Sequence, residues 1–239
     1  MKTNRKELFL TTLVCLLPMA AGAAVYHRLP ETMATHWGMD GAANGWMPRA
    51  AAVFALPALI AAIDLFCCWA MDRDPRKENM STALRSITMW SCPAVSLLCG
   101  TITLGAGLGS EMHVSTVAPL FVGILFLVIG NYLPKTKQSD TLGIRLPWTL
   151  SSEENWDRTH RRTGFLWVAA GLLFLVLTLL HLWNAWLLSG LIVLATLLPL
   201  FYSYYLYRKG IGPFEANRRR ERRLLAAVLM FVSFSAAGS

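Results

Sequence analysis

A stretch of 45 residues, Thr163–Tyr207, contains no Asp, Glu, Lys or Arg. As a single helix it would be about 68 Å long, more than twice the roughly 30 Å of a bilayer's hydrocarbon core. The stretch must therefore fold back on itself, and the polar, aromatic sequence His181-Leu182-Trp183-Asn184 is the predicted corner. Three other uncharged runs, of 20, 25 and 23 residues, are long enough to cross a bilayer: Leu8–His27, Ser86–Ser110 and Met112–Pro134.

These runs predict an all-α fold, a polytopic transmembrane helical bundle. The lipid bilayer is therefore an expected partner. Only 15% of the residues are charged, against about 25% in a soluble domain. The apolar tail 224–239 has 16 residues, so we expect either a short seventh span or, in preference, a segment lying against the bundle. The six predicted spans are approximately 8–26, 50–71, 86–109, 115–133, 165–182 and 185–207.

Lysine and arginine residues alternate between the predicted loops. Of the 22 in the chain, the head, 72–85, 134–164 and 208–223 carry 3, 4, 6 and 7, whereas the loop 27–49 carries 2. Cytoplasmic loops are the ones enriched in these residues, which predicts a cytoplasmic N-terminus. The same rule accounts for the net charge of +8, and no direct nucleic acid binding is expected. The signal-like N-terminus is expected to stay as the first span.

The outer loop, residues 27–49, is predicted to form a compact turn structure. Asp40-Gly41 and Asn44-Gly45 are turn dipeptides, because glycine adopts positive φ without steric penalty. Pro30 and Pro48 stop helices from entering on either side. The residues that form the pattern of this loop are Leu29, Pro30, His36, Trp37, Asp40, Gly41, Asn44 and Gly45.

This pattern resembles a small domain of unknown function found at the N-terminus of SdpI-type membrane proteins. A longer match in the inner loop resembles the SdpI signature, with Gly-Asn-x-x-Pro-Lys, Gly-Ile-Arg-x-Pro-Trp-Thr-Leu and a Trp-x-x-Thr-His pair. The two regions and their spans cover most of residues 10–207. The residues of the second motif are Gly130, Asn131, Pro134, Lys135, Gly143, Arg145, Pro147, Trp148, Thr149, Trp156, Thr159 and His160.

The resemblance implies a bacterial immunity and signalling protein. The type member of that family protects its producer from a secreted antimicrobial peptide and, once toxin is bound, draws a transcriptional repressor to the membrane. We therefore expect the outer motif to sense a peptide toxin and the inner motif to carry the output toward a cytoplasmic repressor. No enzymatic activity, cofactor or metal is expected, because the sequence has no paired acids, no nucleophile with a base and no metal-ligand spacing.

The resemblance and the spans together divide the chain into four parts. These are an N-terminal two-span unit, a third span with a short outer turn, an SdpI-like three-span unit and a basic segment with an apolar tail, at residues 1–72, 86–114, 115–207 and 208–239. The basic run in the last part, Arg218–Arg223, is explained by attraction to anionic lipid or by docking of an acidic cytoplasmic protein.

The inner loop can also be interpreted without the family. Ser151 and Glu154 have the spacing of a capping box, which predicts a helix that begins near Ser152 and continues into the fifth span. Trp156 and His160 share a face of that helix because they are four residues apart. Two interpretations stay open: a membrane-surface helix with snorkelling arginines, or a surface that docks a specific partner.

Two further residues carry alternatives. His36 either organises the outer loop by hydrogen bonding, contacts an extracellular peptide or, with other outer histidines, holds a metal ion. Asp64 is the one acid within a predicted span, and intramembrane acids usually face the bundle interior or a cavity. It has a structural hydrogen-bonding role, lies on an ion or proton path of a small transporter or channel, or reaches the inner interface.

Overall fold

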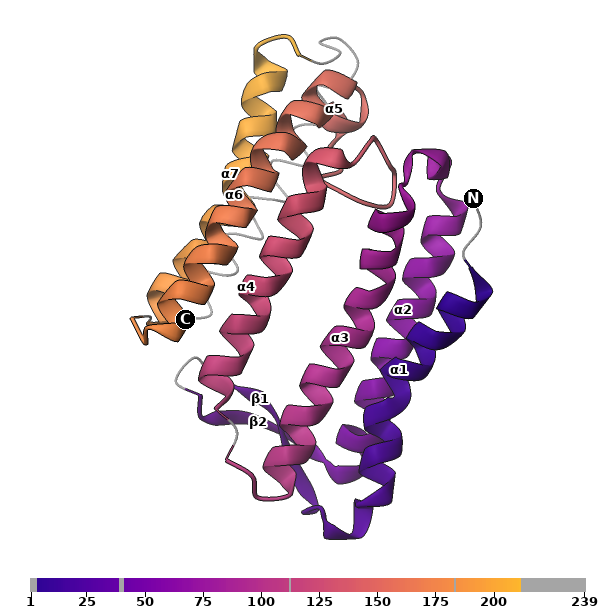
Figure 1. The fold of residues 1–239 in the computed structure, drawn as a ribbon, viewed down its shortest axis with the longest axis vertical. Coiled ribbons are helices and arrows are strands. Elements are labelled where there is room, and N and C mark those ends of the chain that lie inside the picture. Colours follow the sequence, from indigo (N-terminus) through magenta and orange to yellow (C-terminus); the bar gives the residue numbers. More distant parts are fainter. Residues whose placement is uncertain (1–3, 39–40, 112, 183, 212–239) are drawn as a thin grey trace.

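The computed structural model describes residues 4–38, 41–111, 113–182 and 184–211, and it confirms the all-α bundle (Figure 1). Six of its helices are long and apolar enough to cross a membrane, as predicted. The apolar tail and the basic run Arg218–Arg223 lie outside the described residues. The long helices are α1 (Arg5–Ala24), α2 (Leu56–Arg73), α3 (Thr82–Gly107), α4 (Val114–Tyr132), α6 (Glu153–Leu179) and α7 (Ala185–Arg208).

Side-chain caps fix where several of these helices begin. The side chains of Ser81 and Asn184 each accept a backbone N–H from the first turn of α3 and α7, from Leu84 at 3.2 Å and Leu187 at 2.8 Å. The predicted cap of α6 is displaced by one residue, because the Ser151 N–H closes the short helix α5 (Pro147–Leu150) at the carbonyl of Pro147. Ser152 therefore caps α6 and accepts the N–H of Asn155 at 3.2 Å.

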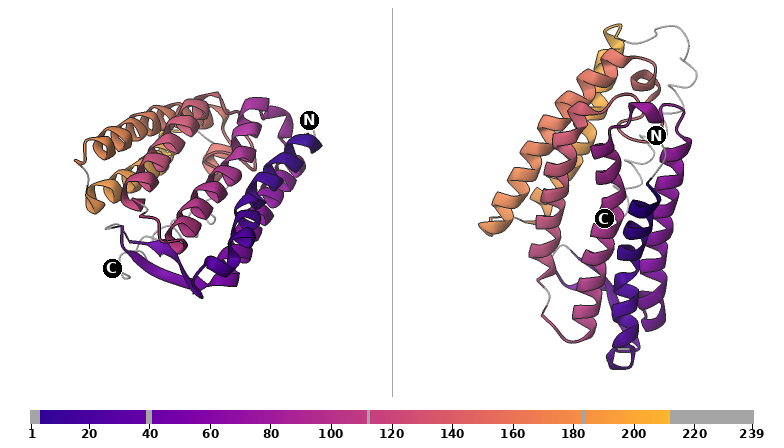
Figure 2. Two further views of the ribbon diagram at one scale, coloured as in Figure 1. Left: turned by 60° about the horizontal axis from the view of Figure 1, so that its bottom comes forward. Right: turned by 45° about the vertical axis from the view of Figure 1, so that its right-hand side comes forward.

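The long helices pack as two groups, α1 with α2 and α3, and α6 with α4 and α7 (Figures 1 and 2). Glycines allow α4 and α6 to lie very close together. A Cβ added at Gly164 would be 2.7 Å from the carbonyl oxygen of Gly130, and one at Gly171 would be 2.7 Å from that of Gly123. Small residues at helix crossings are the usual basis of close packing in lipid.

The loop between α1 and α2 is more ordered than the turn structure predicted for it. It forms an antiparallel hairpin of β1 (Thr32–Trp37) and β2 (Ala43–Pro48). Gly41 adopts a φ of 80° in the turn. At the base of the hairpin, Leu29 and Met33 are buried against Val53 in the π-helical segment Ala51–Ala55 that leads into α2. The local turn signals were correct, but strand pairing depends on this non-local packing.

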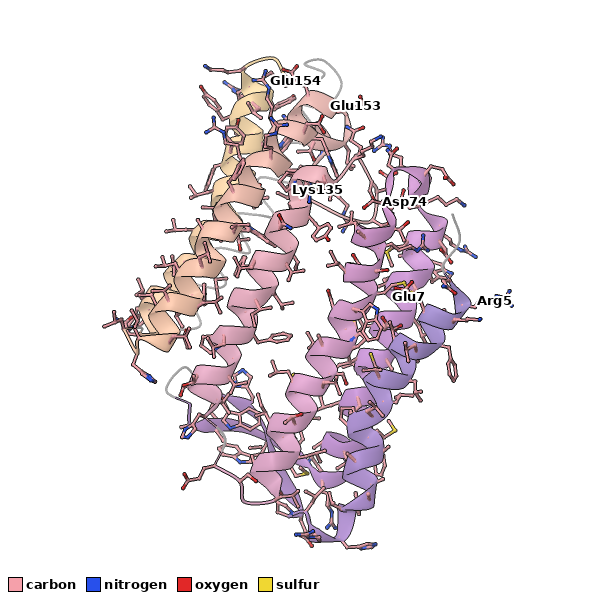
Figure 3. All side chains as sticks on the ribbon, in the orientation of Figure 1. Arg5, Glu7, Asp74, Lys135, Glu153 and Glu154 are labelled. Atoms are coloured by element: carbon pink, nitrogen blue, oxygen red, sulfur yellow. The ribbon has the colours of Figure 1, made fainter. Side chains whose placement is uncertain are left out.

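The hairpin defines one end of the bundle, and we call it the hairpin end. The predicted corner at residues 181–184 lies between α6 and α7, and His181 adopts a φ of 53° there. The opposite end carries Asp74, Lys135 and Glu153 (Figure 3). Of the described Lys and Arg residues, only Arg28 and Arg49 belong to the hairpin-end loop 27–49, so we call the opposite end the basic end.

Candidate functional site

The inner motif lies at the basic end and holds its own loop against α6. The Trp156 and His160 rings stack with centroids 4.0 Å apart, and both residues are almost fully buried. Trp156 Nε1 donates to the carbonyl of Thr136 at 2.8 Å. The backbone N–H of Ile144 donates to His160 Nε2 at 2.9 Å, which places the proton of a neutral imidazole on Nδ1, 2.8 Å from the carbonyl of Trp156.

Thr149 organises the turn before α5. Its buried hydroxyl oxygen accepts the N–H of Leu146 at 2.8 Å and lies 2.7 Å from the carbonyl oxygen of Ile144. The indole of the preceding residue, Trp148, donates to Ser203 Oγ at 3.1 Å and packs against Tyr207. Pro147 occupies the first position of α5, where its missing N–H costs nothing. The Pro-Trp-Thr segment is thus bound to α7 as well as to α6.

Gly143 is required by this packing. Its φ is 98°, and a Cβ there would lie 2.6 Å from His160 Nε2 and 2.9 Å from the Trp156 ring. Thr159 is also buried, and its hydroxyl donates to Asn155 Oδ1 at 3.1 Å. The other members of the motif, Asn131, Pro134, Lys135 and Arg145, are exposed.

Asn155 is a residue that the sequence analysis missed. Its amide nitrogen donates to the carbonyls of Ser203 and Ile211, each at 3.1 Å, so it ties α6 to the end of α7. The available signal was its spacing, since Asn155 and Thr159 are four residues apart and share a helix face with the motif.

A second missed residue, Asp74, joins the two helix groups at the basic end. Its carboxylate accepts Ser139 Oγ at 2.7 Å, the N–H of Thr141 at 2.9 Å and the N–H of Arg76 at 2.6 Å. Burial acts to raise the pKa of this carboxyl, but the hydrogen bonds outweigh it and hold the pKa below its ordinary value. We call Asp74, Ser139 and Thr141 the clasp. Nearby, the amide of Asn79 donates to the carbonyl of Gln138 at 2.8 Å.

Asp64 lies inside the α1–α2–α3 group and is fully buried. Its Oδ2 is 3.0 Å from the Thr11 hydroxyl and 3.4 Å from that of Thr12. Among the described residues, Oδ1 has no hydrogen-bond partner. Closer to the basic end, Arg85 is paired with Asp72. The position of Asp64 is that of an acid facing the bundle interior.

The outer motif lies at the hairpin end, on the opposite side of the bundle from the inner motif. His36 Nδ1 and Asn44 Oδ1 are 2.5 Å apart across the two strands, and both residues are exposed. A Cβ at Gly45 would lie 2.9 Å from that of His36, so glycine lets the strands pair there. Leu29 is buried, Pro30 is exposed, and Asp40 lies outside the described residues. The searched residues contain no group of three His, Cys, Asp or Glu side chains that could hold a metal.

Arg49 anchors the hairpin. Its guanidinium donates to the carbonyls of Tyr26 and Leu29 at 3.2 and 2.9 Å, and it lies 4.4 Å from the centroid of the Tyr26 ring. This cation is therefore used to hold the base of the loop and is a poor candidate for binding an anion.

A cavity of about 230 Å³ lies where the hairpin meets the other helix group. Trp37 and Gly38 line it from the hairpin, Ala118 and Val122 from α4, Phe174 from α6 and Ile192 from α7. We call it the hairpin cavity. Its walls are mainly apolar, and they bring the outer motif together with the C-terminal helices.

Comparisons with known proteins confirm both parts of the sequence resemblance. Residues 13–61 match the family described as "Domain of unknown function (DUF1648)", and residues 135–203 match the "SdpI/YfhL protein family". The chain is also 24% identical over 209 residues to "Immunity protein SdpI" of Bacillus subtilis (strain 168), an alignment that covers 87% of this chain and 99% of that protein. No solved structure matches the chain significantly.

Proposed function

We propose, from the membership of residues 13–61 in the DUF1648 family and of residues 135–203 in the SdpI/YfhL family, that this membrane protein protects its cell from a secreted antimicrobial peptide. The observation that carries the proposal is the extent of the similarity to an immunity protein, 99% of whose length is aligned. A match of that extent includes the hairpin, the spans and the inner loop, and not just one of them.

The hairpin cavity is the proposed contact for the peptide. Amphipathic antimicrobial peptides bury apolar side chains at the membrane interface, and an apolar cavity of about 230 Å³ offers such a side chain an alternative site. The indoles of Trp46 and Trp186, exposed by 58% and 84%, belong to the same end of the bundle. Indole rings favour the headgroup region, where an incoming peptide first meets the protein.

This proposal requires the hairpin end to face outward. The concentration of Lys and Arg at the basic end supports a cytoplasmic position for that end. Reporter domains fused into the Gly109 turn and after Gly210 test the orientation: the first is expected to report an outer location and the second an inner one. The reverse pattern would contradict the proposal that the hairpin cavity contacts the peptide on the outer side.

Survival of toxin-treated cells tests the function itself. Expression of the chain in sensitive cells is expected to raise the lethal concentration of at least one peptide in a panel of secreted antimicrobial peptides. Ala118→Trp fills the hairpin cavity and should abolish most of that protection. Ala169→Trp is the matched control, because Ala169 is exposed on α6 and does not line the cavity. Unchanged survival across the panel would overturn the proposal.

The exposed part of the inner motif is the proposed binding surface for a cytoplasmic repressor. Because the motif's aromatic residues are buried, the side chains available to a repressor include Arg145 and Arg158, both of which are exposed. Toxin treatment should move a cytoplasmic repressor into the membrane fraction. The double variant Arg145→Glu/Arg158→Glu should leave survival unchanged but prevent this movement, and a repressor that still moves would contradict the assignment of this surface.

A second candidate function, transport of ions or solutes by a small transporter or channel, is favoured by Asp64 alone. A carboxyl group buried in a membrane bundle, with one oxygen unpartnered among the described residues, is typical of an ion or proton path. That function requires flux of ions or solutes into liposomes that Asp64→Asn abolishes. Liposomes without such flux would leave Asp64 with a structural role.

A further inference from the structure

We infer that the cleft between α3 and α4 at the basic end binds one anionic phospholipid, with an acyl chain in the cleft and the phosphate at Lys135. The cleft has a volume of about 310 Å³. Leu84, Ile87 and Ser91 line it from α3, and Ile129 and Tyr132 line it from α4. This inference concerns a different part of the molecule from the hairpin cavity and does not depend on the proposed function.

The course of the two helices explains why a cleft exists. A connection of a few residues joins α3 and α4 at the hairpin end, and the two helices belong to different packing groups, so their facing sides are not packed against each other along most of their length (Figure 1). The clasp and the loop at Leu142–Ile144 then bridge the two helix groups above the gap. Residues 84 and 91 are seven positions apart, so the cleft extends about 10 Å along the helix axes, from the basic end into the membrane-spanning part.

The walls of the cleft favour hydrocarbon over water. A buried water usually needs two to four polar partners. Apart from Tyr132, the polar side chains in the lining already donate to backbone carbonyls within the protein, at 2.7 to 3.0 Å. These donors are Thr88, Ser91, Thr136 and Trp167. What remains toward the cleft is mainly apolar surface, and the hydrocarbon at hand in a bilayer is an acyl chain.

The mouth of the cleft supplies the charge that selects the headgroup. Lys135 is exposed, and its ammonium nitrogen lies 4.9 Å from the ring centroid of Tyr132, a residue of the cleft wall. Figure 3 places Lys135 at the basic end of α4, on the side of the gap toward α3. An ammonium group above an apolar cleft is complementary to a phosphate attached to an acyl chain. Basic sites between transmembrane helices bind anionic headgroups in this way.

Purified full-length protein in detergent, titrated with phosphatidylglycerol or phosphatidylcholine of identical acyl chains, tests the inference by native mass spectrometry. We expect one retained lipid per chain and about a fivefold preference for phosphatidylglycerol, the effect of one lysine near an anionic headgroup. Ser91→Trp should fill the cleft and remove retention of both lipids. Thr196→Trp is its control, since Thr196 is exposed on α7 and its hydroxyl bonds within its own helix just as that of Ser91 does.

The headgroup contact is tested separately by Lys135→Ala, an exposed position whose truncation leaves the core intact. This variant should bind the two lipids equally. Lys209→Ala should keep the preference, because Lys209 makes the same contact with a tyrosine ring, at 5.0 Å from Tyr205, away from the cleft. Retention by Ser91→Trp at the wild-type level, or a preference that survives Lys135→Ala, would overturn the inference. So would displacement of the lipid by inorganic phosphate, which would assign the site to a free anion.

Discussion

The inner loop and the hairpin both carry a family motif, but the fold uses the two motifs differently. In the inner loop, Trp156, His160 and Thr149 are buried and their polar atoms are bonded to backbone groups of the same loop. In the hairpin, His36 and Asn44 are exposed and bond to each other. A motif of the first kind fixes a structure, whereas a motif of the second kind leaves its side chains accessible to a ligand.

This difference leads to a ranking of substitutions. A change at a buried residue of the inner loop should reduce stability strongly and affect function through folding. A change at an exposed side chain of the hairpin should affect stability little and function directly. The substitutions below test this separation in order of the expected loss of stability.

Gly143→Ala should have the largest effect. The new Cβ would overlap His160 and the Trp156 ring at a φ that alanine rarely adopts, so overpacking and backbone strain combine. We expect the free energy of unfolding to fall by about 3 kcal/mol or more, measured by thermal or denaturant unfolding in detergent.

Gly109→Ala is the matched control for this substitution. Gly109 has a φ of 83° with nothing within 4 Å of the new Cβ, so only the strain of about 1 kcal/mol should remain. Equal losses in the two variants would mean that the inner loop is not packed as described.

Thr149→Val removes a buried hydroxyl and keeps a side chain of similar size. The N–H of Leu146 and the carbonyl of Ile144 both lose their contact with it, and an unsatisfied buried group costs about 1 to 3 kcal/mol. The melting temperature should fall by several degrees. Thr196→Val on the exposed side of α7 should leave it within about one degree, since surface changes are usually within ±0.5 kcal/mol. A similar melting temperature for both variants would contradict the role of Thr149.

Asp74→Asn should weaken the clasp and remove part of the pH dependence of stability. The folded pKa of Asp74 is below its ordinary value of 3.8, so the carboxylate's contribution to stability is fully present above that value and is lost as the pH falls from it through the lower folded pKa. Wild type should therefore exceed Asp74→Asn in melting temperature by a constant amount from pH 8 to 5, and the gap should narrow below about pH 4.

Asp157→Asn provides the control for the clasp, because Asp157 is exposed on α6 at the same end of the bundle. It should follow the wild-type pH profile. A gap between wild type and Asp74→Asn that stays constant down to pH 3 would show that the carboxylate is not stabilised by its hydrogen bonds.

The sequence predicted the six spans and the corner at His181 because their signals are local: a charge-free run of sufficient length, or a polar interruption within one. It also identified Trp156 and His160 as neighbours on one helix face. It did not predict that the tryptophans, threonines and histidine of the motif are buried. Burial depends on where residues 136–149 return to α6, and no local pattern specifies that contact.

The hairpin and the clasp were missed for the same reason. The strands are stabilised by packing of Leu29 and Met33 on the entry to α2, and Asp74 meets Ser139 from 65 residues away in sequence. A charged residue directly after a span looks like an ordinary interfacial residue. Its role becomes visible only when the loop that it binds is placed beside it.

Trp46→Ala should have the smallest effect on stability and yet a large effect on protection. Its indole is 58% exposed, so truncation removes little buried area and the unfolding free energy should change by about 0.5 kcal/mol or less. Under the proposed function, the lethal concentration of the peptide toxin should fall toward that of cells lacking the protein. Trp90→Ala, which removes an indole 40% exposed on α3, is the control and should leave survival unchanged. Full protection by Trp46→Ala would exclude this indole from the recognition surface and confine peptide contact to the hairpin cavity.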